Sequence, residues 1–173
     1  MILLSLSRNG LRLIPATLTL IRAEIAGSTQ LARALDASIP PSWPPPLTDD
    51  TYDFTLRRLT DHPADILWGK SYILYDQAGL PPVLVGVLGC YGRPDNGSLE
   101  IGYSVLPTYQ KKGYATDALR LFLDWVQTTG AVSRVAAHTL PGLTPSIRVL
   151  EKNGFALVGP GTQAGAILYE RVL

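Results

Sequence analysis

The hydrophobic pattern of the chain is most regular in residues 99–105. Every second residue there is apolar, and this period of two predicts a strand with one apolar face. Pro107 ends the strand, because proline has no backbone N–H to donate to a sheet. Beyond Gly113 apolar residues recur at helical spacing, which predicts a helix that packs one stripe on the sheet. Residues 110–115 are therefore expected at a strand-to-helix junction.

The same patterns predict the other elements. Strands are expected around residues 18–22 and at 66–75, 83–91 and 134–138, with a closing hairpin of 155–158 and 164–171. Helices are expected at 27–37, at 49–60 with Thr48 or Asp49 as N-cap, and from Thr144 to Asn153-Gly154. The prolines of residues 40–46 predict an extended connection around Trp43.

These elements predict an α/β fold with a central, mostly antiparallel mixed sheet and helices on both faces. The strands at 66–75, 83–91 and 99–105 are joined by turns and form an antiparallel meander. The helix after Gly113 forms a right-handed crossover from strand 99–105 to strand 134–138, so these two strands pair in parallel.

Composition limits the classes of protein to which the chain can belong. Its 173 residues suit one domain, residues 1–173. A net charge of +1 gives no electrostatic case for nucleic acid as a main partner. The single cysteine, Cys90, excludes an internal disulfide and a cysteine-rich metal site. No apolar run approaches a membrane span, so we expect no membrane partner and a cytoplasmic location.

The junction at residues 110–115 has the chemistry of an anion site. The first N–H groups of a helix have no intrahelical partner and lie at the positive end of its dipole, so a phosphate is attracted there. Gly113 lets the backbone approach a ligand, and Ala115 is small. Lys111 and Lys112 add positive charge. By contrast, Gly69-Lys70-Ser71 does not match a nucleotide P-loop, because Ala64 replaces the required glycine and no helix pattern follows.

Two blocks of residues carry a family resemblance. Residues 105–115, VLPTYQKKGYA, resemble the acyl-CoA pyrophosphate loop of the GNAT superfamily of N-acetyltransferases, in which Gln or Arg is followed by Gly and then by Gly or Ala. Residues 146–155, SIRVLEKNGF, resemble the second shared block of the branch that contains the ribosomal-protein N-terminal acetyltransferases. The resemblance covers the chain from about Leu18 onward. It implies the GNAT acyl-CoA N-acyltransferase fold and acetyl-CoA as cosubstrate.

The resemblance also implies a set of cofactor-binding residues. The strand that ends at Val105 and the strand that ends near Thr139 should splay apart, and an extended amide chain can then add to the open edge. Backbone groups of Tyr103, Ser104 and Val105 would hold the pantetheine arm. The pyrophosphate would be held by the junction: Gln110, Lys111, Lys112, Gly113, Tyr114, Ala115 and Thr116. The hydroxyl of Thr116 has an equally plausible role as an ordinary residue of the first helical turn.

Two residues are candidates for the transfer chemistry. Glu100 lies on the strand that leads to the loop, where many relatives carry a base that often acts through water; the alternative is a salt-bridged surface carboxylate. Ser146 is the candidate acid for the leaving thiolate, or else an ordinary residue at a helix start. The family's frequent tyrosine is missing between Thr139 and Phe155, and Leu143 replaces an asparagine that often contacts the cofactor.

Other side chains with possible chemistry receive weaker roles. Trp43 either contacts the substrate or covers the core. His138 lies on an apolar strand, which favours a structural or secondary role. Cys90 has no adjacent basic residue, so a covalent acyl-enzyme is disfavoured. No cluster resembles a set of metal ligands.

The sequence thus predicts an acetyl-CoA-dependent N-acetyltransferase in which the amine attacks the thioester directly. By resemblance, the preferred acceptor is a protein N-terminal α-amine. One alternative is a small-molecule amine, such as an aminoglycoside or a polyamine. Another is a non-catalytic acyl-CoA-binding or sensing module, because the missing Tyr and Asn weaken the chemistry more than the binding loop. The oligomeric state, a homodimer included, stays open.

Overall fold

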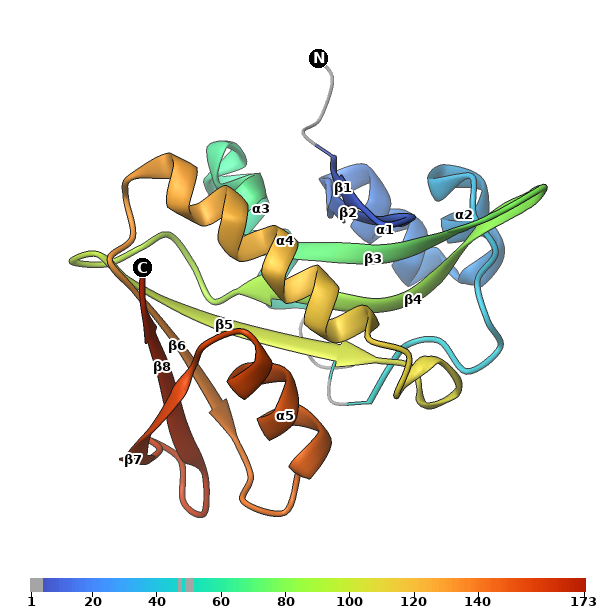
Figure 1. Cartoon of the computed structure of the whole chain (residues 1–173). Helices are drawn as coiled ribbons and strands as arrows, with labels where there is room; N and C mark the ends of the chain where they lie inside the picture. The colour runs from blue at the N-terminus through green and yellow to red at the C-terminus, as the bar shows by residue number, and fades with distance from the viewer. Residues whose placement is uncertain (1–4, 47, 49–51) are drawn as a thin grey trace.

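A mixed sheet of eight strands runs through the computed structural model, which describes residues 5–46, 48 and 52–173 (Figure 1). The strands lie in the order β1-β2-β3-β4-β5-β6-β8-β7, and only β5 and β6 pair in parallel. Their bounds are β1 Leu6–Arg8, β2 Leu11–Pro15, β3 Lys70–Gln77, β4 Leu80–Cys90, β5 Ser98–Val105, β6 Arg134–Thr139, β7 Ala156–Pro160 and β8 Ile167–Val172. The predicted mixed, mostly antiparallel sheet is confirmed.

Helices cover both faces of this sheet, as predicted. Figure 1 shows α4 crossing one face and α1 and α2 on the other. Each face has its own buried cluster, one built around Leu119 and Phe122 of α4 and one around Ile21 and Leu31. The helical bounds are α1 Leu18–Ala26, α2 Ser28–Leu35, α3 Tyr52–Asp61, α4 Tyr114–Thr129 and α5 Thr144–Lys152, with short 3₁₀ turns η2 Pro63–Trp68 and η3 Pro107–Tyr109.

The N-terminal part of the chain differs from the prediction. The predicted strand around residues 18–22 is wrong, because these residues belong to α1, whose first turn is capped by Thr17 through a bond from the Leu20 N–H. Leu20, Ile21 and Glu24 are buried at helical spacing, which the short alternation of apolar residues concealed. The first strands are instead β1 and β2, and β2 alternates buried and half-buried residues.

Other boundaries shift by a few residues. The strand expected at 66–75 begins only at Lys70, because the residues before it form η2. The helix expected at 49–60 is α3, and its predicted cap Asp49 lies outside the described residues. Thr48 is described and donates its hydroxyl to the Pro45 carbonyl at 2.6 Å. The closing hairpin is β7 and β8.

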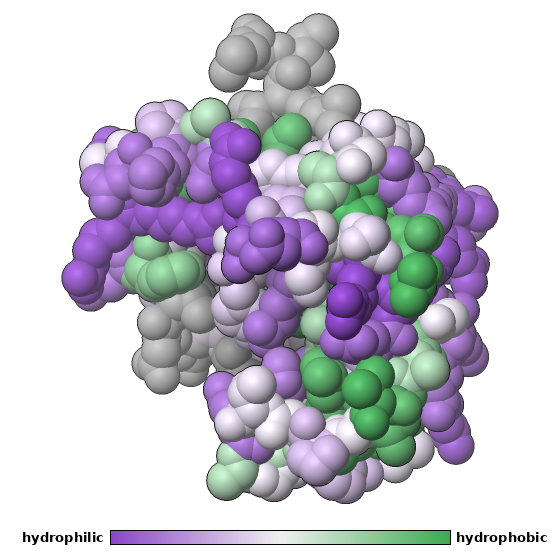
Figure 2. Space-filling model, turned by 90° about the vertical axis from the view of Figure 1, so that its left-hand side faces the viewer, coloured by the Kyte–Doolittle hydropathy of each residue, from purple (hydrophilic) through white to green (hydrophobic). Residues whose placement is uncertain are grey.

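The surface of the molecule mixes polar and apolar side chains. On the face that Figure 2 shows, hydrophobic residues form patches between hydrophilic ones. Exposed apolar side chains include Leu157 and Val158 of β7 and Val172 of β8. Within the described residues, the helices are too short or too polar to cross a bilayer.

The crossover from β5 through α4 to β6 is parallel, as predicted, and it creates an opening. Pairing between β5 and β6 runs from Ser98 with Arg134 to Ile101 with Ala137, and then stops. On its other side β5 stays paired with β4 as far as Val105. The last four residues of β5 therefore have a sheet neighbour on one side only.

Candidate functional site

Two clefts meet where β5 and β6 separate. The larger cleft, of about 810 Å³, lies between the end of β5, the loop into α4 and the start of α5. The smaller cleft, of about 270 Å³, is lined by residues of α3, β4, β5, β6 and α5. Tyr103, Ser104 and Ser146 line both. The two clefts therefore adjoin at these three residues.

The open edge of β5 presents backbone groups to the larger cleft. The N–H of Leu106 donates to Val85 at 2.9 Å, and the N–H of Tyr91 donates to Glu100 at 3.1 Å. Because bonds in an antiparallel ladder alternate, the backbone groups of Tyr103 and Val105 face away from β4, towards the missing strand. The predicted separation of the two strands is thus present in the structure.

The loop into α4 presents further backbone donors. Among the described residues, the N–H groups of residues 111–116 meet no hydrogen-bond acceptor. Lys111 and Gly113 both have left-handed backbone angles, with φ of 61° and 89°, and Gly113 is the N-cap of α4. The side-chain amide of Gln110 holds the loop to the strand, because it donates to the Val105 carbonyl at 3.0 Å. These unpaired donors lie at the positive end of a sixteen-residue helix.

The two clefts differ in the charged side chains that line them. Among the described residues, the larger cleft is lined by three cations, Lys111, Arg148 and Lys152, and by no carboxylate. Lys112, also predicted to bind cofactor, is not in its lining and has its Nζ 5.2 Å from the centre of the Tyr109 ring. The larger cleft is therefore suited to an anion.

The smaller cleft has the opposite character. Its cations are paired: Lys70 lies 2.7 Å from Glu24, and Arg58 lies 3.3 Å from Asp65, a carboxylate that Arg93 also contacts. Among the described residues of its lining, Glu100 is the one carboxylate. The Glu100 side chain is 46% exposed and lies beside His138. This cleft is therefore suited to a cation such as a protonated amine.

Tyr103 brings its hydroxyl to Ser146 where the clefts meet. Its Oη donates to the Ser146 carbonyl at 3.0 Å and lies 3.2 Å from Ser146 Oγ. Burial raises the pKa of Tyr103 to about 12, so this hydroxyl keeps its proton at neutral pH. The sequence indicated only the backbone of Tyr103; the contact of its side chain depends on α5 and had no sequence motif.

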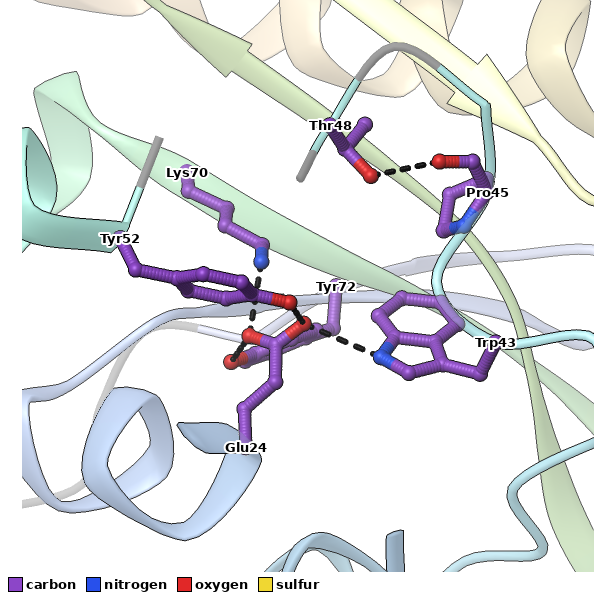
Figure 3. A network of polar contacts seen from close by, with 7 residues as sticks. All are labelled: Glu24, Trp43, Pro45, Thr48, Tyr52, Lys70 and Tyr72. Atoms are coloured by element: carbon purple, nitrogen blue, oxygen red, sulfur yellow. Dashed lines mark hydrogen bonds and ion pairs between the residues drawn. The ribbon is translucent and has the colours of Figure 1, made fainter. Parts of the chain in front are cut away.

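Trp43 belongs to a polar network around the buried Glu24 carboxylate, and one member of this network, Lys70, lines the smaller cleft (Figure 3). Nε1 of Trp43 donates to Glu24 at 3.0 Å, and Trp43 lines neither cleft. The Glu24 carboxylate, 1% exposed, also accepts bonds from Tyr52 at 3.0 Å, Lys70 at 2.7 Å and Tyr72 at 2.6 Å. The ammonium of Lys70 lies 5.0 to 6.0 Å from three aromatic ring centres. The network fixes Lys70, which lines the smaller cleft.

Burial shifts the pKa values of two members of this network, Lys70 and Tyr72. It lowers the pKa of the Lys70 ammonium, and the carboxylate of Glu24 acts in the opposite direction. Burial, together with the charge of Glu24, raises the pKa of Tyr72. The pairing of Glu24 with Lys70 was not predicted from the sequence. Lys70 was considered there only in the rejected P-loop match, and Glu24 is the one polar residue among the buried residues of α1.

The remaining candidates lie as follows. Leu143 lines the larger cleft and is 41% exposed. Ser104 was predicted to bind the cofactor through its backbone, and this prediction is wrong, because by the same alternation its backbone groups face β4. Its hydroxyl donates to the Pro46 carbonyl at 2.9 Å. Burial raises the pKa of the Cys90 thiol to about 12, which disfavours a nucleophilic thiolate. In the described part of the chain, no three potential ligand side chains gather as a metal site.

Comparison with known proteins agrees with this architecture. A family model described as an acetyltransferase (GNAT) domain matches residues 11–156. The uncharacterized N-acetyltransferase YjdG of Bacillus subtilis (strain 168) is 36% identical over 75 residues, which are 43% of this chain and 45% of that protein. The chain thus matches less than half of the length of this curated relative.

Solved structures match over nearly the whole chain. The ribosomal-protein-S5-alanine acetyltransferase from Vibrio fischeri superposes with a TM-score of 0.70 at 18% identity, covering 98% of this chain and 96% of that one. RimL, a ribosomal L7/L12 alpha-N-protein acetyltransferase in complex with coenzyme A, gives 0.68 at 18% identity, with 98% of both chains covered. At this identity the likeness shows the fold alone. Since the family model covers most of the chain and the fold agrees, the chain belongs to the GNAT acetyltransferase family.

Proposed function

We propose that the protein is an acetyl-CoA-dependent N-acetyltransferase that acts on a primary amine, with a protein N-terminal α-amine as the preferred acceptor. The observation that carries this proposal is the pair of clefts of opposite charge character that meet at Tyr103, Ser104 and Ser146. An anionic thioester donor and a cationic amine acceptor would occupy one cleft each. Direct attack in a ternary complex follows from this arrangement.

The larger cleft fits acetyl-CoA in three respects. The open edge of β5 offers the backbone groups of Tyr103 to the amides of a pantetheine arm. The unpaired N–H groups of residues 111–116 suit the pyrophosphate. Arg148 and Lys152 add charge for the remaining phosphate. The coenzyme A in the RimL structure supports this assignment by analogy of fold.

The chemistry can be assigned to groups on both sides of the junction. The amine must lose its ammonium proton, which Glu100 accepts directly or through a water. The neutral nitrogen then attacks the thioester carbonyl, the C–N bond forms and the C–S bond breaks. The leaving thiolate accepts a hydrogen bond from Ser146 Oγ, which lies 3.2 Å from the Tyr103 hydroxyl. The amide nitrogen loses its second proton to solvent, and the sulfur gains one.

The choice of an α-amine rests on the cost of deprotonation. At pH 7 an α-amine with a pKa near 8 costs about 1–1.5 kcal/mol to deprotonate, whereas a lysine side chain with a pKa of about 10.4 costs about 4–5 kcal/mol. A carboxylate is a weak base and suits the smaller cost. The smaller cleft, at about 270 Å³, admits the end of a peptide rather than a bulky acceptor. Phe54 and Tyr91, 58% and 66% exposed, lie in its lining and offer apolar contact for the first residues.

The proposal is tested with acetyl-CoA and three sets of acceptors. The first set is short peptides with a free α-amine, the second is the same peptides with a blocked N-terminus and an added lysine, and the third is aminoglycosides and polyamines. Release of free thiol and the mass of the product are measured. We expect product with the first set only. Turnover with the third set alone would replace the α-amine by a small-molecule acceptor, and tight coenzyme A binding without any turnover would overturn the enzymatic proposal.

A further inference from the structure

The imidazole of His138 is held at both of its nitrogen atoms beside the smaller cleft. Nδ1 lies 2.9 Å from Oε1 of Glu100, and Nε2 lies 3.3 Å from the backbone nitrogen of Thr162. A backbone N–H can only donate, so Nε2 is the acceptor in this bond. Nδ1 is then the nitrogen that carries a hydrogen towards the carboxylate of Glu100.

The sheet register brings these two side chains together. Glu100 is the register partner of Ala136 in the parallel β5 and β6 pair, and side chains two positions apart share a face. His138 therefore lies on the same face as Glu100. The residue next along this face of β5 is Gly102, which has no side chain to separate them. Both Glu100 and His138 line the smaller cleft.

The loop between β7 and β8 is shaped to receive the His138 ring. A Cβ added to Gly161 would lie 2.7 Å from Cδ2 of His138, closer than real Cβ contacts allow. The next residue, Thr162, supplies the N–H that holds Nε2, and its Oγ1 lies 3.4 Å from the same atom. Two neighbouring features of one loop therefore fix the position and the tautomer of one side chain.

We propose that His138 is a positioning residue for acetyl transfer. Through the hydrogen on Nδ1 it holds the carboxylate of Glu100 in the orientation that accepts a proton from the acceptor amine, and Gly161 and Thr162 of the β7–β8 loop hold His138. His138 does not itself take the proton, because its acceptor nitrogen is occupied by the Thr162 N–H. This inference rests on the proposed function, in which Glu100 is the base.

The need for such support follows from the exposure of Glu100. Its side chain is 46% exposed, whereas that of His138 is 20% exposed. A half-exposed glutamate has several accessible rotamers, and a base is effective only in the one that reaches the amine. The bond from a fixed imidazole selects one arrangement. The closing hairpin, for which the sequence offered no motif, thereby acquires a part in the reaction.

Two substitutions at position 138 test this role. In His138→Asn the side-chain amide nitrogen can take the place of Nδ1 and still donate to Glu100, whereas His138→Leu keeps the bulk and removes the donor. We expect His138→Leu to lower kcat by about tenfold, with the KM for acetyl-CoA unchanged. We expect His138→Asn to retain most of kcat. His62→Asn, at an exposed histidine outside both clefts, is the matched control and should match the wild type.

A double-mutant cycle then asks whether His138 acts through Glu100. Glu100→Gln alone should lower kcat by about 100-fold. Adding His138→Leu to Glu100→Gln should cause no further loss, because the carboxylate to be positioned is gone. Gly161→Ala, whose added Cβ would meet Cδ2 of His138 at 2.7 Å and Cβ of Ala166 at 2.9 Å, should resemble His138→Leu, whereas Gly142→Ala, at a glycine with open space around it, should be silent. Coenzyme A affinity, measured by calorimetry, confirms that each variant is folded.

The failures of the two proposals can be told apart. If the wild-type protein acetylates no amine, the proposed function fails. If the wild type is active and His138→Leu keeps the wild-type kcat, the positioning role is overturned while the enzymatic function stands. The same holds if the fold-loss in kcat caused by His138→Leu multiplies fully with that caused by Glu100→Gln in the double variant. If His138→Asn is as impaired as His138→Leu, the hydrogen bond to Glu100 is not the cause and the proposal is equally overturned.

Discussion

The hydroxyl of Tyr103 lies 3.2 Å from Oγ of Ser146, although 43 residues separate them in the chain. The pair lies where the two clefts meet, and it joins the end of β5 to the first turn of α5. The Tyr103 hydroxyl, which burial keeps protonated, donates to the Ser146 carbonyl at 3.0 Å and so helps to fix Ser146 in place. Tyr103 thus brings a phenolic hydroxyl beside Ser146, although the second sequence block has no tyrosine.

This pair predicts a coupled loss of catalysis. Tyr103→Phe should lower kcat by about tenfold and Ser146→Ala by about 10- to 100-fold, with little change in the KM for the amine. If the tyrosine acts through the serine, the double variant should be no slower than Ser146→Ala. Steady-state kinetics of the four proteins measures this. Independent, multiplying effects would show that the two hydroxyls do not work together.

The loop at the start of α4 predicts a specific loss of cofactor binding. Gly113→Val places a branched side chain beside the unpaired N–H groups, at a φ of 89° that disfavours any side chain, so coenzyme A affinity should fall at least about tenfold. Gly130→Val is the matched control, because Gly130 caps the other end of the same helix with a φ of 63°. Gly130→Val should lower the stability of the protein by a comparable amount and leave its affinity for coenzyme A unchanged. Isothermal calorimetry measures this affinity for both variants, and equal losses of affinity would contradict the assignment of this loop to the cofactor.

The network around Glu24 predicts a large effect on stability. Glu24→Gln leaves the ammonium of Lys70 buried without a counter-charge, and breaking such a pair costs about 3–5 kcal/mol. The double variant Glu24→Gln with Lys70→Met removes both charges, keeps an amide oxygen as acceptor for Trp43, Tyr52 and Tyr72, and should cost less than Glu24→Gln alone. Urea denaturation gives the free energies of unfolding. A double variant that is less stable than Glu24→Gln would show that the unpaired ammonium is not the source of the loss.

Cys90 predicts how stability changes at alkaline pH. Burial raises the pKa of its thiol from 9.0 to about 12 in the folded protein, so the folded state favours the protonated form. The free energy of unfolding therefore does not depend on the ionisation of this thiol below about pH 9, where the thiol is protonated in both states. Above that pH the unfolded thiol ionises first, so the free energy of unfolding falls as the pH rises towards 12. Between about pH 8 and about pH 10.5, the free energy of unfolding should therefore fall more for the wild type than for Cys90→Ala, as measured by urea denaturation. Parallel curves would contradict the shift. The native thiol should also react slowly with thiol reagents, so that it adds little background to a thiol-release assay.

Sequence reasoning was most successful where structure and chemistry are local. Strand, turn and helix in residues 99–129 follow from periodicity, from Pro107 and from Gly113, and all three lie in neighbouring stretches of the chain. The separation of β5 from β6 also followed, though from the family resemblance rather than from any residue pattern.

Sequence reasoning failed where partners are distant or the pattern is short. Glu100 meets His138 across 38 residues, and Lys70 meets Glu24 across 46, so neither contact leaves a local pattern. In α1, Leu18, Leu20 and Arg22 fit an alternation only because three residues cannot distinguish a period of two from a helical one. The sheet on which α1 packs decides which face of this helix is buried. This packing is a tertiary contact that the local sequence pattern does not reveal.

The short pairing between β5 and β6 has one further consequence. Four register pairs join these strands in the described residues, from Ser98 to Ile101, and beyond them β5 and β6 are no longer paired. On the proposed function, an incoming pantetheine arm would fill this interruption as a ninth, non-peptide strand. The bound coenzyme would then connect β5 to β6 beyond their last register pair. We therefore expect the melting temperature of the protein to rise when coenzyme A binds.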